Sequence, residues 1–229
     1  MKVILSSKVD LVKYPNAYSV ECGLADNIRH FDHHKDEHRQ YPSPCNNPAV
    51  PVVEKDAVVF ISHIDFDTFA ALCRMESGCM TFDGKTAMNL NLCEQIDLNG
   101  SSILLSLNCF EYECMIGVQE VAREFKFPRC TEQEQDVTTI INKMLEFPEA
   151  TYCATGKESM KKSEATYKKC LIDTQGKACF IALGLGESID PSRPYRDGFE
   201  VGVMYRADYK SISIYADPKS NHTFVGKEF

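Results

Sequence analysis

Two short segments, 27–39 and 58–72, hold most of the side chains that could bind a metal ion. The candidate ligands in them are Asp32, His33, His34, His63, Asp65 and Asp67. Neutral imidazole and carboxylate together suit Mn²⁺, Fe²⁺ or Zn²⁺, and carboxylates can bridge two ions. Two such ions ~4 Å apart would polarise a phosphoryl group and lower the pKa of a bridging water. The pattern therefore predicts a metal centre with hydrolytic chemistry.

Both clusters stand where a predicted strand ends. Runs 2–7 and 17–23 are strand-like, and segment 27–34 ends a third strand. The run 57–64 is continuously apolar and rich in valine, which is typical of a strand buried on both faces. It leads into a helical pattern at 65–77, and strand, turn and helix form the basic unit of a parallel α/β sheet. Parallel strands end at one shared edge, so we expect the two clusters to converge there.

Near residue 172 the predicted elements change from mainly helical to mainly strand-like. Segments 84–127 and 131–170 read as mainly helical, with Thr131 and Glu134 predicting a capping box. Beyond them, strand-like runs cover 177–184, 199–208 and 210–217. We therefore predict an α/β fold class: a parallel-sheet metal-binding domain over 1–172, followed by a smaller α+β accessory domain over 173–229.

Composition limits the partners. The net charge is −8, which argues against binding a long nucleic acid and leaves a small phosphorylated substrate or a short oligonucleotide. No apolar run approaches the ~20 residues that cross a bilayer, so we expect no membrane partner. The eleven cysteines are scattered, and no signal-peptide core is seen at the start. We expect reduced thiols and a cytoplasmic protein, as a monomer or a homodimer.

The motifs resemble those of the DHH phosphoesterases. "FDHH" at 31–34 is similar to the family signature, "SHIDFDTFAA" at 62–71 resembles its His-x-Asp-x-Asp motif, and "SVECG" at 19–23 resembles its strand ending in aspartate. Glu21 stands where that aspartate is usual. The resemblance implies a DHH-like parallel-sheet domain and a two-metal phosphohydrolase, commonly with Mn²⁺, although Mg²⁺, Fe²⁺ or Zn²⁺ would also fit.

The resemblance also implies roles for individual residues. The implied metal ligands are Glu21, Asp32, His63, Asp65 and Asp67. His33 would be a further ligand or a residue of the surrounding shell, and His34 would lie near the scissile phosphate. The two motifs occur in reversed order here, which a permutation of strands around one site would allow. The glycine-rich, histidine-containing loop of the family's second domain is replaced by "SNHTFVG" at 220–226, with His222 as the sole histidine.

Several further residues are weaker candidates. Asp97 could supply a fourth carboxylate, or it could cap a helix that starts near Ser101. Substrate phosphate could be clamped by arginines of the second domain, with scattered surface arginines as the more common alternative. These arginines are Arg193, Arg196 and Arg206. We read His38 and its acidic neighbours as a charged surface segment.

The leading hypothesis is a metal-dependent phosphohydrolase or phosphodiesterase that acts on a nucleotide or another small phosphoester. His34, with His33 beside it, is the candidate catalytic residue. A metal-dependent hydrolase of a non-phosphate bond would use the same ligands and is one alternative. A non-catalytic relative of the fold that binds a nucleotide or a protein is the other.

Overall fold

The computed structural model describes residues 1–34, 36–38, 40–78, 88–100, 103–104, 109–217 and 220. Within them the chain is mixed α/β, with two β-sheets and six α-helices. It divides into two compact units. The first comprises Met1–Glu94 with Asn108–Lys157, and the second comprises Gln95–Leu107 with Glu158–Phe229. We had expected a boundary after residue 172.

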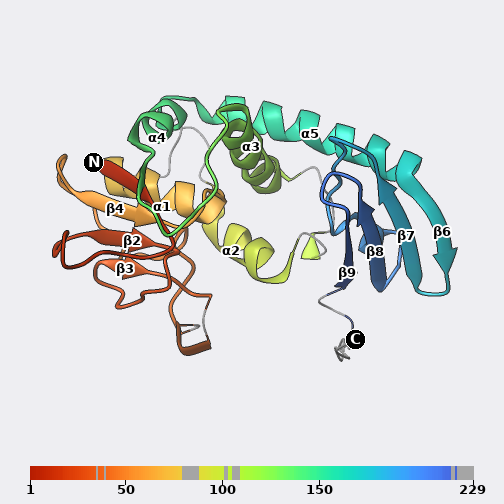
Figure 1. Cartoon of the computed structure of the whole chain (residues 1–229), viewed down its shortest axis with the longest axis horizontal. Helices are drawn as coiled ribbons and strands as arrows, with labels where there is room; N and C mark the ends of the chain where they lie inside the picture. Colours follow the sequence, from red (N-terminus) through yellow and green to blue (C-terminus); the bar gives the residue numbers. More distant parts are fainter. Residues whose placement is uncertain are drawn as a thin grey trace. The chain divides into compact units, whose positions relative to one another are not determined.

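The first unit is built on a five-stranded sheet with strand order β3-β2-β4-β1-β5 (Figure 1). The strands are β1 (Lys2–Leu5), β2 (Tyr18–Val20), β3 (His30–Phe31), β4 (Val58–Ile61) and β5 (Gln135–Asp136). The first four strands in this order are parallel to their neighbours, and β5 runs antiparallel to β1 at the edge. The strands predicted within 2–7, 17–23, 27–34 and 57–64 are confirmed.

Both faces of this sheet are buried, as the apolar run in β4 predicted. Val59 and Ile61 face a large core that also includes residues of α1 (Phe66–Ser77), α3 (Phe110–Glu124) and α4 (Thr138–Leu145). Phe60 points to the opposite face and packs with Ala17 and Tyr14 of the β1–β2 connection. Apolar packing on both faces thus holds the sheet in place, and with it the residues that follow its strands.

Helix α1 begins directly behind β4 because its first turn is capped. The Asp65 carboxylate accepts a hydrogen bond from the Thr68 backbone N–H at 2.9 Å, and the helix ends at Gly78, which adopts a left-handed backbone with φ 72°. An acidic N-cap satisfies an amide that has no partner within the helix, and glycine adopts positive φ without steric cost. The helix predicted from 65–77 is confirmed.

The predicted capping box at Thr131 is wrong. Residues 135–136 form β5 and pair with β1, so the chain is extended where the capping box would need helix. Helix α4 begins at Thr138, whose backbone N–H donates to the Asp136 carboxylate at 3.0 Å. Edge pairing with a buried strand here outweighs a local capping signal.

Helix α3 crosses α5 (Glu149–Cys170) at two glycines, within the residues of the first unit. A Cβ on Gly117 would lie 1.9 Å from the Tyr152 carbonyl oxygen, and one on Gly156 would lie 1.8 Å from the Glu113 carbonyl oxygen. No side chain fits at either position. The two backbones can therefore pack together only because both residues lack a Cβ.

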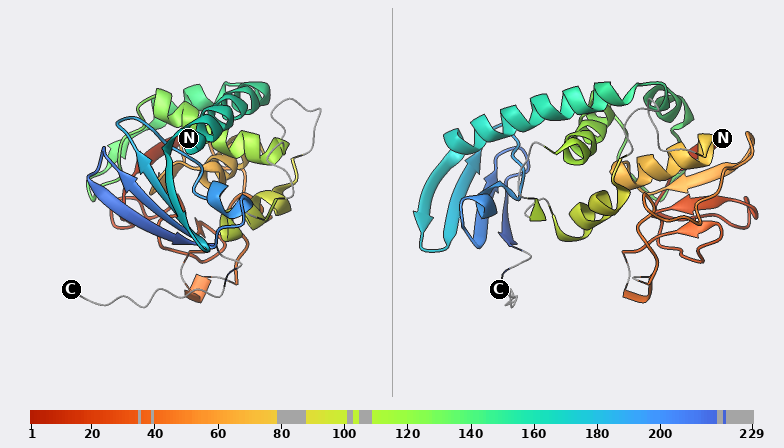
Figure 2. Two further views of the ribbon diagram at one scale, coloured as in Figure 1. Left: turned by 90° about the vertical axis from the view of Figure 1, so that its right-hand side faces the viewer. Right: turned by 180° about the vertical axis from the view of Figure 1, so that it is seen from behind.

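The second unit holds a four-stranded sheet of order β6-β7-β8-β9 (Figure 2). Its strands are β6 (Leu171–Gln175), β7 (Ala178–Leu183), β8 (Val201–Arg206) and β9 (Ser211–Ala216). β7 and β8 are parallel and are connected through the short helix α6 (Arg193–Arg196), whereas the two outer pairs are antiparallel. The three strands predicted here are confirmed, and β6 was not predicted, because it is short and follows α5 without an intervening turn.

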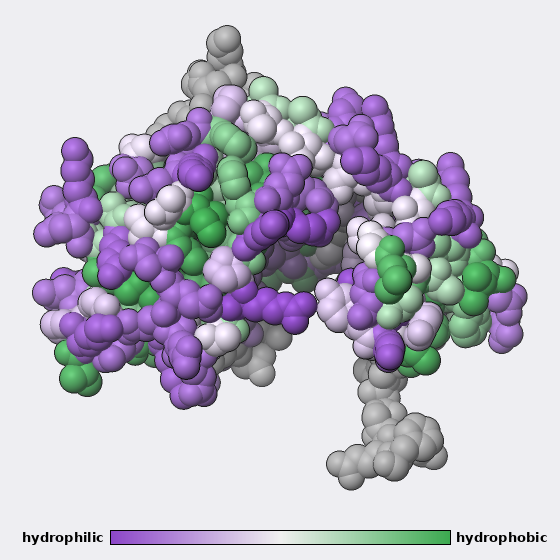
Figure 3. Space-filling model, turned by 45° about the horizontal axis from the view of Figure 1, so that its top comes forward, coloured by the Kyte–Doolittle hydropathy of each residue, from purple (hydrophilic) through white to green (hydrophobic). Residues whose placement is uncertain are grey.

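The face drawn in Figure 3 is mainly hydrophilic, with small groups of hydrophobic side chains between the hydrophilic ones. On β9, Ile212 and Ile214 are 68% and 55% exposed. Among the described residues, no helix combines the length and the apolar character that crossing a bilayer requires.

Candidate metal centre

Three neighbouring parallel strands deliver the candidate ligands to one edge of the first sheet. Glu21 directly follows β2, while His33 and His34 follow β3, and His63 follows β4 after one residue. Asp67 lies in the first turn of α1. β2 lies between β3 and β4 in the sheet, so Glu21 stands between the two histidine segments. The convergence at the carboxyl edge is the one expected for an open parallel sheet.

These residues form two groups that could each hold a metal ion. The first ligand group is Glu21, His34 and His63, and the second ligand group is Glu21, His33 and Asp67. In each group, one ligand atom per residue lies within 4.8 Å of the others. Glu21 belongs to both groups. A carboxylate shared in this way is the arrangement by which two neighbouring ions are bridged.

The second ligand group is almost fully buried. The side chains of Glu21, His33 and Asp67 are 0%, 3% and 3% exposed. His33 Nε2 lies 3.4 Å from an Asp67 carboxylate oxygen and 3.7 Å from Glu21 Oε1. Ligand atoms that each lie about 2.0–2.2 Å from one ion are separated by roughly 3.0–3.6 Å, so these spacings are close to those of a coordination shell.

The first ligand group is more open to solvent. The His34 and His63 side chains are 53% and 42% exposed. His34 Nε2 is in direct contact with Glu21 Oε2, and the His34 and His63 rings are 6.3 Å apart. This group therefore offers ligand atoms on a surface that a substrate could reach.

Glu21 supplies an independent test of whether a metal fits. Its Oε1 atom is buried and has no hydrogen-bond partner in the part of the chain that the structure describes. Buried carboxylate oxygens are nearly always satisfied by a donor or by an ion. The ligand atoms of the two groups are imidazole nitrogens and carboxylate oxygens, which together suit a first-row divalent metal. The residues present thus fit a metal centre.

Electrostatics in the metal-free protein follow from the burial of Glu21. Burial raises the pKa of Glu21 to about 7, although its hydrogen bond with His34 acts in the opposite direction. The same hydrogen bond raises the pKa of His34 to about 9, against the effect of partial burial. The hydrogen bond to Asp65 raises the pKa of His63 above its ordinary value. Near neutral pH, the His34 imidazolium therefore compensates the charge of Glu21.

The backbone of Glu21 is unusual for a residue with a side chain. Its φ is 58°, in the left-handed region. Its N–H donates to the Phe31 carbonyl at 2.9 Å, and its carbonyl accepts from the Ser62 hydroxyl. Such backbone strain costs about 1–3 kcal/mol and persists where the surroundings impose it, commonly at functional sites.

Asp65 and Asp32, both expected as ligands, lie outside the two groups. Besides capping α1, Asp65 accepts a hydrogen bond from His63 Nε2 at 2.9 Å, which places it beside the first ligand group. Burial acts to raise the pKa of Asp65, but its bonds with His63 and Thr68 hold it below the ordinary value. Asp32 instead accepts from the backbone N–H groups of Gly23 and His34. It orders the loop on which His34 stands.

The weaker candidates from the sequence belong to the second unit. Asp97 is an exposed residue of α2 (Leu90–Asn99). Arg193 is engaged with Glu164 and, at 2.7 Å, with Asp197. His222 lies outside the described residues.

The other two arginines also have contacts within the second unit. Arg196 donates to the Leu104 carbonyl at 3.3 Å, and the Arg206 guanidinium lies over the Tyr209 ring at 4.6 Å. All three arginines thus have partners within the second unit, and no described contact supports the predicted phosphate clamp.

Two serines near the ligands were missed at the level of sequence. Ser62 contacts the Glu21 carbonyl and His63 Nδ1, and Ser43 donates to an Asp67 carboxylate oxygen at 3.2 Å. Ser62 adjoins His63 in the chain, which was the available signal. Ser43 carries no signal, because only the fold brings it to Asp67.

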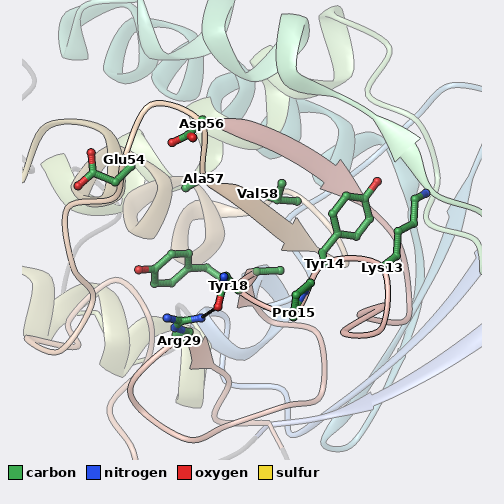
Figure 4. Close-up of a pocket in the computed structure, with 11 residues that line it drawn as sticks. Lys13, Tyr14, Pro15, Tyr18, Arg29, Glu54, Asp56, Ala57 and Val58 are labelled. Atoms are coloured by element: carbon green, nitrogen blue, oxygen red, sulfur yellow. Dashed lines mark hydrogen bonds between the residues drawn. The ribbon is translucent and has the colours of Figure 1, made fainter.

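A separate cavity of about 450 Å³ lies at the opposite, amino edge of the same strands (Figure 4). Its walls include Tyr14, Tyr18, Arg29 and Glu54. Arg29 already donates to Asn16 at 2.8 Å. No candidate ligand of either group lines this cavity.

Comparisons of the chain with protein-family models, with curated proteins and with solved structures gave no match. The functional interpretation therefore rests on the side chains and their geometry.

Proposed function

We propose that the chain is a two-metal phosphohydrolase that acts on nucleotides or other small phosphoesters. The observation that carries the proposal is the shared carboxylate of Glu21, which belongs to two histidine–carboxylate groups at one sheet edge. A single structural ion needs no such bridge. Paired ions are the usual device for in-line displacement at phosphorus, and the resemblance of the motifs to DHH phosphoesterases supports the same chemistry.

The roles of the residues follow from their exposure. In this proposal Glu21 would be shared by both ions, His33 and Asp67 would complete the buried position, and His63 would hold the open position with Asp65 beside it. Bound ions would polarise the phosphoryl group and lower the pKa of an attacking water. His34 belongs to the first ligand group by distance, but it is the exposed member of the histidine pair, so we assign it to the substrate, where it donates a hydrogen bond or a proton. Glu21 and His63, with Asp65 beside them, are then left to hold the open ion.

Mn²⁺ is the metal that the resemblance to DHH phosphoesterases favours, and the donor set is compatible with it. Imidazole donors suit Mg²⁺ less well, because Mg²⁺ prefers oxygen ligands and water, and no thiolate belongs to either group. Fe²⁺ and Zn²⁺ remain chemically compatible. The net charge of −8 favours a small substrate over a polymer. The ten cysteines within the described residues are free thiols, which supports a reducing compartment such as the cytoplasm.

The test begins with protein stripped of metal by a chelator. Mn²⁺, Mg²⁺, Fe²⁺ and Zn²⁺ are titrated separately by calorimetry, and each loaded form is assayed against bis(p-nitrophenyl) phosphate, nucleoside monophosphates and dinucleotides. We expect about two Mn²⁺ per chain and hydrolysis that depends on them. A loaded protein that cleaves an amide but no phosphoester contradicts the proposal, as does one that cleaves nothing.

His34→Ala tests the assignment of the catalytic histidine. Turnover should fall by about 10²-fold or more, the usual effect of losing a positioned acid, while two ions still bind. His30→Ala is the matched control, because His30 contacts Ser19 at 2.9 Å and belongs to neither ligand group. If His34→Ala removes an ion while His33→Ala does not, the two histidines have the opposite roles.

A further inference from the structure

The Ser62 hydroxyl connects two candidate ligands that come from different strands. It donates its proton to the backbone carbonyl of Glu21, and its oxygen lies 2.8 Å from His63 Nδ1. Glu21 follows β2 and Ser62 follows β4, so this contact ties together the ends of two adjacent strands. Ser62 thus contacts the backbone of the shared ligand and the side chain of an open-position ligand.

The direction of these hydrogen bonds follows from simple valence. A carbonyl oxygen can only accept, so the single hydroxyl proton of Ser62 is used by Glu21. Toward His63 Nδ1 the serine oxygen must then act as the acceptor, and Nδ1 must carry the proton. In the metal-free protein Nε2 also carries a proton, which it donates to Asp65. An ion would replace that proton, which leaves a neutral ring with its proton on Nδ1 and its lone pair on Nε2.

Nε2 is the ring nitrogen that the contact with Ser62 leaves available to an ion. It lies 2.9 Å from an Asp65 carboxylate oxygen, on the side of the ring away from Ser62. An ion needs the lone pair of the imidazole, and metal-bound histidines commonly donate their other N–H to a fixed acceptor. The Ser62 oxygen has the position and the chemistry of that acceptor.

We infer that Ser62 is a positioning residue of this centre, which directs Nε2 of His63 to the ion and holds the Glu21 backbone in its left-handed conformation. The inference rests on the proposed metal function. It assigns Ser62 to the open ion position, because His63 belongs only to the first ligand group.

Ser43 provides a matched hydroxyl at the other position. It is fully buried and donates to Asp67, which belongs only to the second ligand group. Removing either hydroxyl deletes one oxygen atom near the centre. If each serine acts through its own ligand, the two deletions should affect different ions.

The experiment compares Ser62→Ala, Ser62→Thr and Ser43→Ala with the parent protein. Binding of Mn²⁺ is measured by calorimetry, and the ¹⁵N resonances of His63 are recorded with Zn²⁺, which is diamagnetic. Ser62→Ala should weaken one of two ions by about 10–100-fold and abolish the protected Nδ1–H signal. Ser62→Thr keeps a hydroxyl and should show the parental ion affinity and the Nδ1–H signal. Ser43→Ala should weaken the other ion and leave the His63 signal unchanged.

Two results would overturn the inference: parental affinity with a retained Nδ1–H signal in Ser62→Ala, or the same loss of that signal in Ser43→Ala. Circular dichroism shows whether the variants fold, and Ser62→Thr separates lost packing from a lost acceptor. A parent that binds two ions but hydrolyses no phosphoester ends the proposed function and leaves the Ser62 result intact. If the parent hydrolyses phosphoesters but Ser62→Ala changes neither the ion affinity nor the Nδ1–H signal, the inference about Ser62 fails and the proposed function stands.

Discussion

Glu21→Gln is the substitution that most directly separates two effects of the candidate centre: its destabilisation of the metal-free fold and its binding of ions. Gln has the size of Glu but carries no charge and is a poor metal ligand. Because Glu21 belongs to both ligand groups, its replacement should remove both ions, whereas His33→Ala should remove mainly the buried one. The variant should also lose any metal-dependent hydrolysis.

The same substitution should stabilise the metal-free protein. The Glu21 side chain is fully buried, and burial raises its pKa from 4.5 to about 7. The raised pKa means that the folded state binds more protons than the unfolded state, so stability is full below pH 4.5 and is lost as pH rises toward 7. At ~1.4 kcal/mol per unit, ionised Glu21 costs the fold about 3 kcal/mol above neutral pH.

Urea unfolding with and without Mn²⁺ measures both effects. In a chelator at about pH 8, Glu21→Gln should be more stable than the parent by up to ~3 kcal/mol, and at about pH 5 the difference should fall below ~1 kcal/mol. Mn²⁺ at 100 times its dissociation constant should add ~2.7 kcal/mol per ion to the parent alone. The reasoning is refuted if Glu21→Gln binds two ions, or if it is less stable than the metal-free parent at high pH.

Two further changes test the local structure. Asp65→Ala should lower the free energy of unfolding of the metal-free protein by about 1 kcal/mol, because the N-cap to Thr68 is lost. Asp65→Asn should keep the cap and weaken ion binding at the open position. An equal loss of stability in both variants would contradict the capping role. Gly156→Ala should cost more than about 3 kcal/mol in thermal unfolding, because its Cβ would overlap the Glu113 carbonyl, and Gly176→Ala, with open space but φ 57°, should cost far less.

Elements with a strong local signal could be predicted from the sequence. The run 57–64 is apolar on both faces and leads into a capped helix, so β4 and α1 were both expected. The failures lie where tertiary contacts decide. Residues 135–136 are polar and pair with β1 only because that edge is open to them. β6 follows α5 without an intervening turn, and pairing with β7 makes it a strand.

The candidate site shows the same division. His33, His63 and Asp67 were predicted from the motifs and Glu21 from the family resemblance, and the structure brings all four into the two ligand groups because each stands after a strand or in the helix behind it. Asp32 could not be placed in the same way. The side chain of Asp32 can turn toward an ion or toward its own loop, and the backbone N–H groups of Gly23 and His34 draw it to the loop.

Strand order explains why reversed motifs can still build a shared site. In the sheet, β2 lies between β3 and β4, although β3 separates β2 from β4 in the chain. The residue after the middle strand is therefore within reach of both histidine segments, whichever segment comes first in sequence. A carboxylate at that place can serve as the common ligand of the proposed centre, and Glu21 extends toward it from a left-handed backbone that turns out of the strand. The requirement on the sequence is thus one acidic residue after the middle strand, with histidines after both of its neighbours.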